Sequence, residues 1–485
     1  MRPRRAIARR LVPGLALLAA GVAGAASAAG AAPSAYERPR DGVPVMEALV
    51  SAEARDAYRL RLDLHVSAPV WIFLRSGRDR ATGASWRAGS WRVLTEGVRL
   101  ARIGHHEALV TVDGGALPSR VEIAFAPFEG LLESDYQPAL RLGPDSTALF
   151  SDHFTLRPAP SVGAVQALGA DWTMLPDYAG GHPLVRFEGR DFHHGGRHGS
   201  FAVPAAAYVL HGPAAGRTTD QLVMRVDPAV PGWLADQLEE EIPAILAYYA
   251  ARLGPHEDER PELLVGWAGA TPGRVRLGGS VVANQVVMQL EGAPLLAPSP
   301  LAAARARQFI AHEAAHFWLG NLVGYGPPGA AWTSEGGADL MALRATQAVD
   351  PDGAAALGAA TLRASWDECV QLGGGGPLAA APERGADQAF YGCGFLFGLV
   401  AEAAARRAGG DFFDFWSALI ARSGDDGTVS APEWLDHHAA IGGPPEATAL
   451  MRAMAFSVPV TAARLEALFA AAGLAPPRPP AAPAS

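Results

Sequence analysis

Short stretches of alternating hydrophobic and polar residues run through the first part of the chain. The clearest are residues 58–64 and 108–113, and residues 121–125 and 148–156 continue the pattern. An alternation of period two is typical of β-strands that bury one face. Because these stretches recur between glycine and proline turns, they predict an antiparallel β-sandwich domain over residues 36–213.

Longer patterns of helical period follow in the second part of the chain. Residues 231–253 carry apolar side chains on one helical face, and residues 263–267 and 280–290 have the composition of strands. We therefore expect a second, mainly helical domain over residues 218–475, followed by a disordered Pro/Ala-rich tail over residues 476–485. The predicted fold class is α+β.

The N-terminus has the three-part order of a secretory signal peptide. An arginine-rich start precedes the apolar run Leu11–Ala25, and small residues follow at 26–28. We expect a signal peptide over residues 1–28, so that the mature protein is exported and is either periplasmic or secreted. An uncleaved membrane anchor is the alternative, because the Ala/Gly-rich stretch continues to Ala32. No second run of this kind follows, so we expect no stable membrane span after cleavage.

Composition and charge narrow the classes of function. Of the 485 residues, 49% are hydrophobic and 18% are charged, which is enough apolar surface for a buried core. All 40 basic residues are arginine, which excludes chemistry that needs a lysine, such as Schiff-base formation. The net charge of -9 becomes -9 - 5 = -14 without the five arginines of the expected signal peptide. Such an acidic protein is not expected to bind nucleic acid.

A helix predicted from Ser299 to about Leu322 carries the candidate chemistry. Ser299 is suited to cap this helix, and the proline after it is suited to the first helical position. His312 and His316 are four residues apart, and Glu313 follows the first of them. On an α-helix this spacing brings the two imidazoles to one face, one turn apart, where they can bind one metal ion.

A second motif can supply a third metal ligand. Glu335 follows His316 after 18 intervening residues, which is enough chain for a helix end, a loop and a second helix start. Two histidines and a carboxylate, with the fourth position left to water, are the ligands of a catalytic zinc site. Asp339 lies one helical turn beyond Glu335 and is suited to accept a hydrogen bond from a ligating imidazole. We therefore predict one Zn²⁺ per chain, bound by His312, His316 and Glu335.

Residues 312–323, which read HEAAHFWLGNLV, closely resemble the gluzincin peptidases of the alanyl-aminopeptidase family when Glu335 is included at its spacing. This family includes aminopeptidase N and leukotriene hydrolase. The resemblance covers roughly residues 218–443 and implies a thermolysin-like domain that acts on peptide substrates. Glu313 would then be the general base, and Tyr391, which matches the family's tyrosine in position and setting, would donate a hydrogen bond to the oxyanion.

The sequence departs from this family at two points. The family's G-[AG]-M-E-N strand, whose glutamate binds the free amine of the substrate, has its counterpart in residues 280–284. Ala283 replaces that glutamate, and Ala283 and Asn284 are the expected substrate-binding positions. We also expect the large C-terminal helical domain of the family to be missing. The prediction is peptide hydrolysis with weak dependence on a free amine, with broad aminopeptidase action as the alternative that the family implies.

The only two cysteines are Cys369 and Cys393. In an oxidising compartment they can form a single disulfide, and two buried thiols are the alternative. Two cysteines are too few for a disulfide scaffold, so a hydrophobic core must stabilise the fold.

Several other histidines occur in clusters. They lie in residues 192–198 and in the pairs 105–106 and 437–438. Glycines within the first cluster argue against a helix that would bring its imidazoles together. We interpret all three clusters as solvated loops rather than metal sites.

Three functions are compatible with these features. The first is an exported zinc metallopeptidase, aminopeptidase-like in its site. The second is a hydrolase that acts on a non-peptide substrate, as leukotriene hydrolase does with an epoxide. The third is a non-catalytic binding protein with an inactive peptidase fold. Metal content and peptide cleavage distinguish the three.

Overall fold

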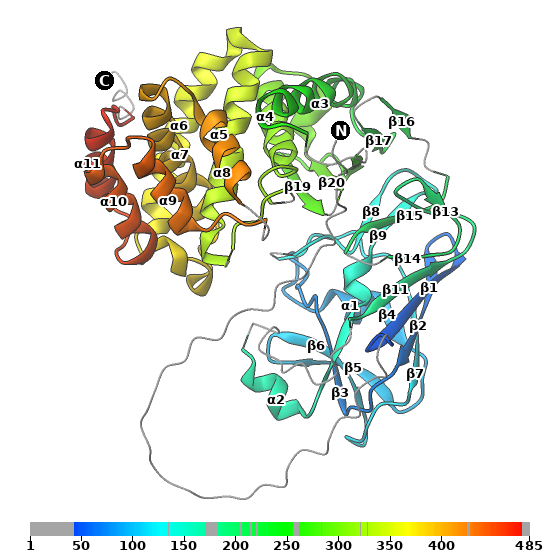
Figure 1. Ribbon diagram of the computed structural model, residues 1–485. Coiled ribbons are helices and arrows are strands. Elements are labelled where there is room, and N and C mark those ends of the chain that lie inside the picture. The colour runs from blue at the N-terminus through cyan, green and yellow to red at the C-terminus, as the bar shows by residue number, and fades with distance from the viewer. Residues whose placement is uncertain are drawn as a thin grey trace, which may run out of the picture. The chain divides into compact units, whose positions relative to one another are not determined.

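Figure 1 shows the computed structural model of the chain. The structure describes residues 43–133, 135–169, 182–203, 206–213, 216–219, 222–255, 261–282, 284–320, 322–326, 328–423 and 427–477. These residues belong to one compact unit, Tyr36–Ser485. The predicted signal peptide, residues 1–28, lies outside them. Within the described part of the chain, no helix combines the length and the apolar character needed to cross a membrane.

The first sheet has six strands in the order β14-β11-β1-β2-β7-β4. Side chains of β2 alternate between buried and half-buried positions, and this alternation agrees with the strand predicted over residues 58–64. Neighbouring strands are antiparallel except β1 and β11, which pair in parallel. The bounds are β1 Met46–Ala54, β2 Ala57–Leu64, β4 Trp91–Val93, β7 Arg120–Phe125, β11 Leu184–Glu188 and β14 Phe201–Val203.

Two further sheets complete the β-rich part, in the orders β10-β3-β6-β5 and β13-β12-β15-β9-β8. Leu60 of the first sheet and Trp71 and Leu109 of the second are buried in one hydrophobic core, as expected of a sandwich. The strand bounds are β3 Val70–Phe73, β5 Val98–Ile103, β6 His106–Thr111, β8 Ala139–Arg141, β9 Thr147–Phe150, β10 Leu156–Ala159, β12 Phe192–His194, β13 Arg197–His198 and β15 Tyr208–His211. Short helices lie between them: α1 Trp86–Ser90, η1 Ser151–Phe154 and α2 Val162–Ala167.

The fourth sheet introduces the second part of the chain and has the order β16-β17-β18-β20-β19. The single strand predicted over residues 280–290 is wrong, because the chain forms a hairpin there with its turn at Asn284. Among the described strands, β19 is therefore an edge strand that pairs only with β20. The bounds are β16 Arg217–Thr218, β17 Val223–Val226, β18 Glu262–Trp267, β19 Arg276–Val282 and β20 Gln285–Glu291.

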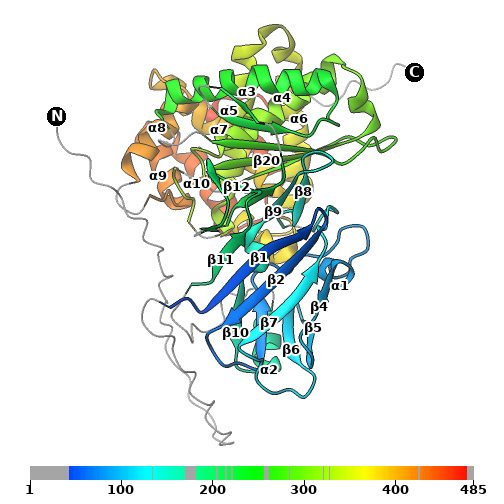
Figure 2. The same ribbon diagram turned by 90° about the vertical axis from the view of Figure 1, so that its right-hand side faces the viewer.

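Both faces of this sheet are covered. Val286 and Met288 pack on one face against the core that contains helices α3 (Gly232–Leu253) and α4 (Pro300–Ala315). Leu264 and Val287 pack on the other face against the third sheet, where Tyr208 is buried. Figure 2 shows β20 between these helices and strands β8 and β9.

The remaining helices pack around α5 and α7, whose backbones meet at two glycines. A Cβ atom on Gly336 of α5 would lie 2.1 Å from the carbonyl carbon of Gly394 of α7, so neither position has room for a side chain. The helix bounds are α5 Trp332–Val349, α6 Pro351–Gly373, α7 Ala389–Arg407, α8 Phe412–Arg422, α9 Ala431–Ala440, α10 Pro445–Phe456 and α11 Ala462–Ala472. Single turns lie at η3 Ala293–Leu296, η4 Pro328–Ala330, η5 Leu378–Ala380 and η6 Pro382–Arg384. The α+β class is confirmed.

The interpretation of the clustered histidines as loops is wrong for most of them, although His105 lies in an exposed turn. His437 and His438 are buried on helix α9, which begins with a capping box formed by Ser430 and Glu433. His193 and His198 lie on the paired strands β12 and β13, where their Nδ1 atoms are 2.7 Å apart. Within the described residues, His312, His316 and Glu335 are the only such group placed to share a metal ion.

Candidate metal centre

Helix α4 places both predicted histidines at its C-terminal end. The Ser299 hydroxyl accepts a hydrogen bond from the Ala302 N–H at 3.1 Å, which caps the start of the helix. The helix ends at Ala315 and does not reach Leu322, because the chain turns immediately after His316. His316 Nδ1 lies 2.9 Å from the Leu319 carbonyl oxygen across this turn. His316 still lies above His312, and their Nε2 atoms are 3.1 Å apart.

Helix α5 brings Glu335 to the same point. Glu335 Oε2 lies 3.5 Å from His312 Nε2 and 3.3 Å from His316 Nε2. Glu335 precedes Gly336, where α5 and α7 touch, and Tyr391 lies one turn before the matching Gly394 on α7. The close crossing of two helices at glycines therefore places Glu335 and Tyr391 on either side of one site.

These three side chains fit a zinc ion. Ligand bonds of about 2.0–2.1 Å in a tetrahedron place neighbouring ligand atoms roughly 3.3 Å apart. The three observed separations, 3.1, 3.3 and 3.5 Å, lie close to this value. Each imidazole also has a partner for Nδ1: Asp339 Oδ1 at 2.8 Å for His312 and the Leu319 carbonyl for His316. An Nδ1–H donated to these oxygens leaves both Nε2 lone pairs directed at the shared centre.

The charges around the two imidazoles also favour a cation. Burial alone would lower the pKa of His312, but Asp339, Glu335 and Glu313 together raise it well above the ordinary value. The pKa of His316 is also raised, because Glu335 outweighs the effect of burial. The imidazoles in turn hold the pKa of Glu335 far below its ordinary value, although burial opposes this. A site that stabilises positive charge in this way is suited to a divalent metal.

Glu313 lies beside the three candidate ligands and is only 6% exposed. Burial raises its pKa, while His312 and His316 oppose the rise. Gly279 of β19 approaches Glu313 so closely that no side chain would fit between them. A carboxylate with a raised pKa at such a site is suited to accept and return a proton.

Tyr391, on helix α7, lies beside the three candidate ligands. Its ring stacks on the His312 ring, with centroids 5.7 Å apart and 24° between the planes. Burial and the carboxylates of Glu335, Glu313 and Asp339 raise the pKa of its hydroxyl far above the ordinary value. Tyr391 therefore keeps its proton and can act as a hydrogen-bond donor.

A disulfide joins Cys369 and Cys393 and so links helices α6 and α7. Cys393 lies two residues after Tyr391, and both sulfur atoms are buried in the core of the helical part. The link therefore restrains the first turn of α7, which carries Tyr391.

A cavity of about 350 Å³ contains all five of these candidate side chains. It is also lined by Tyr136 from the β-rich part and Tyr325 from the loop after α4, which the sequence analysis missed. No spacing rule links Tyr136 to the histidines, because only the folded chain brings them together. Tyr325 lies in a loop beside Gly326, and such a loop gives no periodic signal.

The two predicted substrate-binding positions, Ala283 and Asn284, stay predictions. Ala283 lies outside the described residues, and Asn284 lies in the hairpin turn, where its carbonyl accepts a hydrogen bond from the Glu262 N–H at 2.9 Å. The strand residues that line the cavity are instead Gly279, Ser280 and Val281. Because residues 280–290 looked like one strand, the sequence analysis did not predict the turn at Asn284. Strand β19 itself contains no carboxylate.

Solved structures of other proteins share this fold. The aminopeptidase N family protein from Idiomarina loihiensis aligns with a TM-score of 0.58 at 10% sequence identity, over 86% of this chain and 77% of that chain. Native LTA4 hydrolase from yeast aligns with a TM-score of 0.50 at 12% identity, over 88% of this chain and 69% of that chain. No family model and no curated protein matches the sequence. The likeness confirms, at the level of the fold, the resemblance inferred from the sequence.

Proposed function

We propose that this chain is an exported zinc metallopeptidase that hydrolyses peptide bonds. One observation carries the proposal: the two imidazoles and Glu335 lie at the separations of tetrahedral zinc ligands, with Glu313 and Tyr391 beside them in one cavity. Three protein ligands leave a fourth position for water, as in catalytic rather than structural zinc sites.

The residues around this centre have distinct roles in the proposed reaction. When bound, zinc supplies a Lewis acid that lowers the pKa of water and polarises the scissile carbonyl. Glu313 takes the proton from the attacking water and returns it to the leaving amine, so that its own charge is restored. Tyr391 donates a hydrogen bond to the oxygen that becomes negative during the attack. Asp339 accepts a hydrogen bond from Nδ1 of His312 and so orients this imidazole.

Strand β19 supports binding of an extended peptide. One edge of β19 pairs with β20, and no other strand of the described sheet pairs with its opposite edge. The main-chain groups of Gly279 and Ser280 lie at that edge, in the wall of the cavity. A peptide can therefore add to the sheet as a further strand, which places its backbone beside Glu313.

We propose that cleavage depends only weakly on a free amino terminus. In the related family a carboxylate on this strand binds the amine, but β19 presents only Gly279, Ser280 and Val281 to the cavity. A peptide and its N-acetylated twin should be cleaved with similar kcat/KM. A loss beyond about a hundredfold, near 3 kcal/mol, on acetylation would show that another carboxylate binds the amine.

The proposal extends to the ends and domains of the chain. Residues 1–28 would direct export and be removed, which N-terminal sequencing of the mature protein tests directly. Residues 36–213 would form the β-domain and residues 218–475 the catalytic domain, followed by the tail 476–485. Expression of either proposed domain alone tests whether it folds.

The most direct functional experiment is cleavage of a mixed peptide library by the zinc-loaded mature protein, with the product termini sequenced by mass spectrometry. We expect cleavage that stops when zinc is removed by a chelator and returns when zinc is added back. Bound zinc without cleavage of any peptide would overturn the proposal in favour of a non-peptide substrate. Absence of both zinc and cleavage would favour a binding protein.

A further inference from the structure

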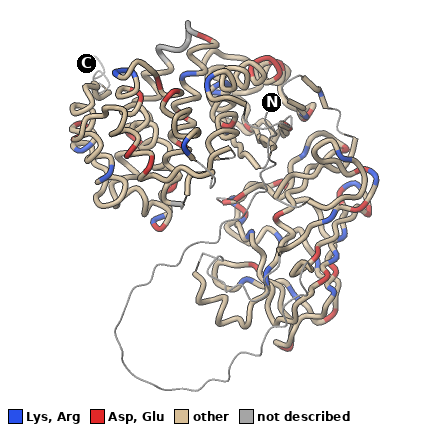
Figure 3. Tube along the Cα trace, in the orientation of Figure 1, with Lys and Arg blue, Asp and Glu red and all other residues tan. Residues whose placement is uncertain are grey.

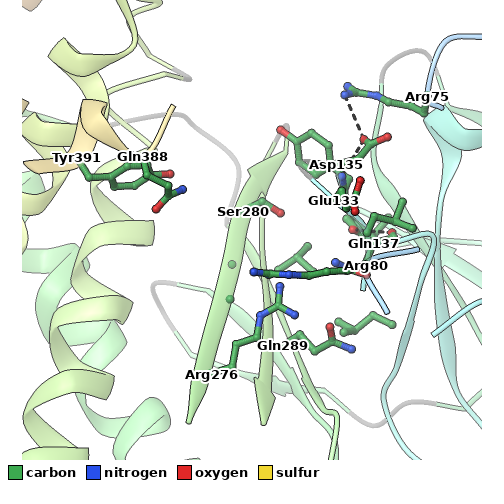
Figure 4. A pocket seen from close by; sticks show the side chains of 17 residues that line it. Arg75, Arg80, Glu133, Asp135, Gln137, Arg276, Ser280, Gln289, Gln388 and Tyr391 are labelled. Carbon is green, nitrogen blue, oxygen red and sulfur yellow. Dashed lines mark hydrogen bonds and ion pairs between the residues drawn. The ribbon is translucent and has the colours of Figure 1, made fainter. Parts of the chain in front are cut away.

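A larger cavity, of about 920 Å³, adjoins the candidate metal centre. Its walls come from the loops around Arg80 and Leu132 in the β-rich part, from strand β19 and from the start of α7 (Figure 4). Gly279, Ser280 and Tyr391 line both this cavity and the smaller one. A substrate that reaches Glu313 along β19 therefore extends into the larger cavity.

Two arginines from opposite walls of this cavity point toward each other. Arg80 projects from the β-rich part, and Arg276 projects from the first position of β19 (Figure 4). No ion pair joins either of them to a carboxylate among the described residues, and Arg276 Nη1 is buried without a hydrogen-bond partner. Burial and the charge of Arg80 lower the pKa of Arg276, as expected when two like charges lie near each other.

Arginines elsewhere in the β-rich part are commonly paired with acids. Arg59 pairs with Glu53, and Figure 3 shows basic and acidic positions interspersed along these strands. Arg75, in the wall of the same cavity, lies 2.7 Å from Asp152 and 3.5 Å from Asp135. In this cavity Arg80 is exposed and Arg276 is half-buried, and neither has an acidic partner among the described residues. The exposed Arg92 and Arg99 elsewhere in the β-rich part lack such a partner too.

Two acids lie in the same wall, and among the described residues neither forms an ion pair with Arg80 or Arg276. Glu291, opposite Arg276 on β20, interacts instead with Arg274 and Thr271. Asp135 accepts hydrogen bonds from the N–H groups of Gly77 at 3.2 Å and Tyr136 at 2.8 Å, and it also pairs with Arg75. Glu133 lies on the Asp135 side of the cavity in Figure 4. Two guanidinium groups thus face the cavity beside β19, where they can bind a negatively charged group of a substrate.

The position of Arg276 on the strand sets the distance from the reacting bond. Arg276 is three residues before Gly279, which lies against Glu313, so the two positions are about 10 Å apart along an extended strand. A peptide paired antiparallel to β19 runs from the metal centre toward Arg276 in its N-to-C direction. Its C-terminal carboxylate reaches the arginines when about three residues follow the scissile bond.

We propose that Arg80 and Arg276 form a carboxylate-binding subsite that selects short peptides whose C-terminus lies about three residues beyond the cleaved bond. This inference rests on the proposed peptidase function. Guanidinium groups bind carboxylates with paired hydrogen bonds, and two of them match both oxygens. An aspartate or glutamate side chain of the peptide at the same position would also present a carboxylate to the two arginines. The test must therefore distinguish a side-chain carboxylate from the C-terminal one.

The test uses three forms of one cleaved peptide, trimmed so that three residues follow the bond: the free acid, the C-terminal amide, and the amide with aspartate as its last residue. For the wild-type protein we expect kcat/KM of the free acid to exceed that of the amide at least tenfold. Arg276→Gln should remove this difference, and Arg80→Gln should reduce it. Arg92→Gln, which removes an exposed arginine of β4, is the matched control and should leave it unchanged.

Each remaining outcome decides the question. Equal rates for acid and amide in an active wild-type protein would overturn the subsite and leave the peptidase function intact. If Arg276→Gln lowers cleavage of the amide as strongly as cleavage of the acid, Arg276 has a structural role. That result would also overturn the subsite. Recovery of the rate by the aspartyl amide would support the subsite with a side-chain source. Absence of any peptide cleavage would overturn the proposed function and, with it, this inference.

Discussion

Gly279 and Glu313 lie so close together that a Cβ atom on Gly279 would be 2.7 Å from the Glu313 carboxyl carbon. The same atom would be 2.8 Å from Phe309 Cζ, so the space is closed from two sides. The backbone of edge strand β19 therefore packs directly against the carboxylate of Glu313, the proposed general base. Only glycine at position 279 allows this close contact.

Gly279→Ala should displace the Glu313 carboxylate without removing a metal ligand. A displacement of about 1 Å in a reacting group can lower a rate roughly a hundredfold. We expect kcat to fall by about this factor while zinc content, measured by atomic absorption, stays at one per chain. Gly278→Ala is the comparison, because its Cβ would meet Arg276 Nε at an ordinary 3.5 Å. Equal losses of kcat in the two variants would show that the close packing of Gly279 against Glu313 does not matter for the rate.

Substitutions of a proposed metal ligand and of Asp339, the proposed orienting partner, should differ in their effect on zinc affinity. Removing a ligand in His316→Ala should abolish stable zinc binding, because only two protein ligands remain. Asp339→Asn should weaken binding only about 10- to 100-fold, since Asp339 acts through His312 Nδ1. Competition with a chromogenic chelator measures both affinities. Unchanged zinc affinity in His316→Ala would place the metal elsewhere.

Tyr391→Phe should fold and bind zinc but react slowly. The loss of one preorganised donor to an oxyanion typically costs about 10² to 10³ in rate. The ring would still stack on His312, so the substitution removes the hydroxyl alone. Steady-state kinetics should show a lower kcat with little change in KM. Wild-type kcat in this variant would assign the oxyanion donor to another residue.

His438 should make the folded protein sensitive to acid. Its side chain is fully buried on α9, with Nδ1 2.8 Å from Thr448 Oγ1, and burial together with Arg407 and His437 lowers its pKa to about 4. Since the unfolded chain takes up this proton near pH 6.5 and the folded chain does not, the stability present above pH 6.5 is lost as the pH falls toward 4. The loss amounts to about 3 kcal/mol.

Urea unfolding at several pH values checks this expectation. The wild-type free energy of unfolding should decline between pH 6.5 and 4, and His438→Gln should decline less steeply whatever its absolute stability. Parallel curves for the two proteins would show that His438 does not titrate in this range.

Local patterns were enough to predict the parts of the site that lie on one helix. The four-residue spacing of His312 and His316 fixes their relation because helical geometry is set by the backbone alone. The alternation likewise predicted strands β2, β6 and β7. The stretch over residues 148–156 is wrong as one strand, because the helical turn Ser151–Phe154 separates β9 from β10. The end of α4 was placed too late because the residues after His316 remain apolar, although the chain turns there.

These local patterns could not predict contacts between segments that are far apart in the sequence. The contact of Gly336 with Gly394, which brings Glu335 and Tyr391 together, depends on how two helices cross. Tyr136 and Arg80 reach the cavities only because the β-rich part packs near the edge strand. The capping box at Ser430 and Glu433, in contrast, was a local signal that would have predicted helix α9.

The cleavage rate per bound zinc, compared between wild-type protein and Glu313→Gln, tests the zinc peptidase proposal most directly. Glu313 lies in the cavity but is not among the three proposed metal ligands, so both proteins should bind one zinc per chain. A general base contributes about 10² to 10⁴ to a rate, and the variant should lose at least a hundredfold in peptide cleavage. Equal rates per bound zinc, or a wild-type protein that binds no zinc, would contradict the proposal.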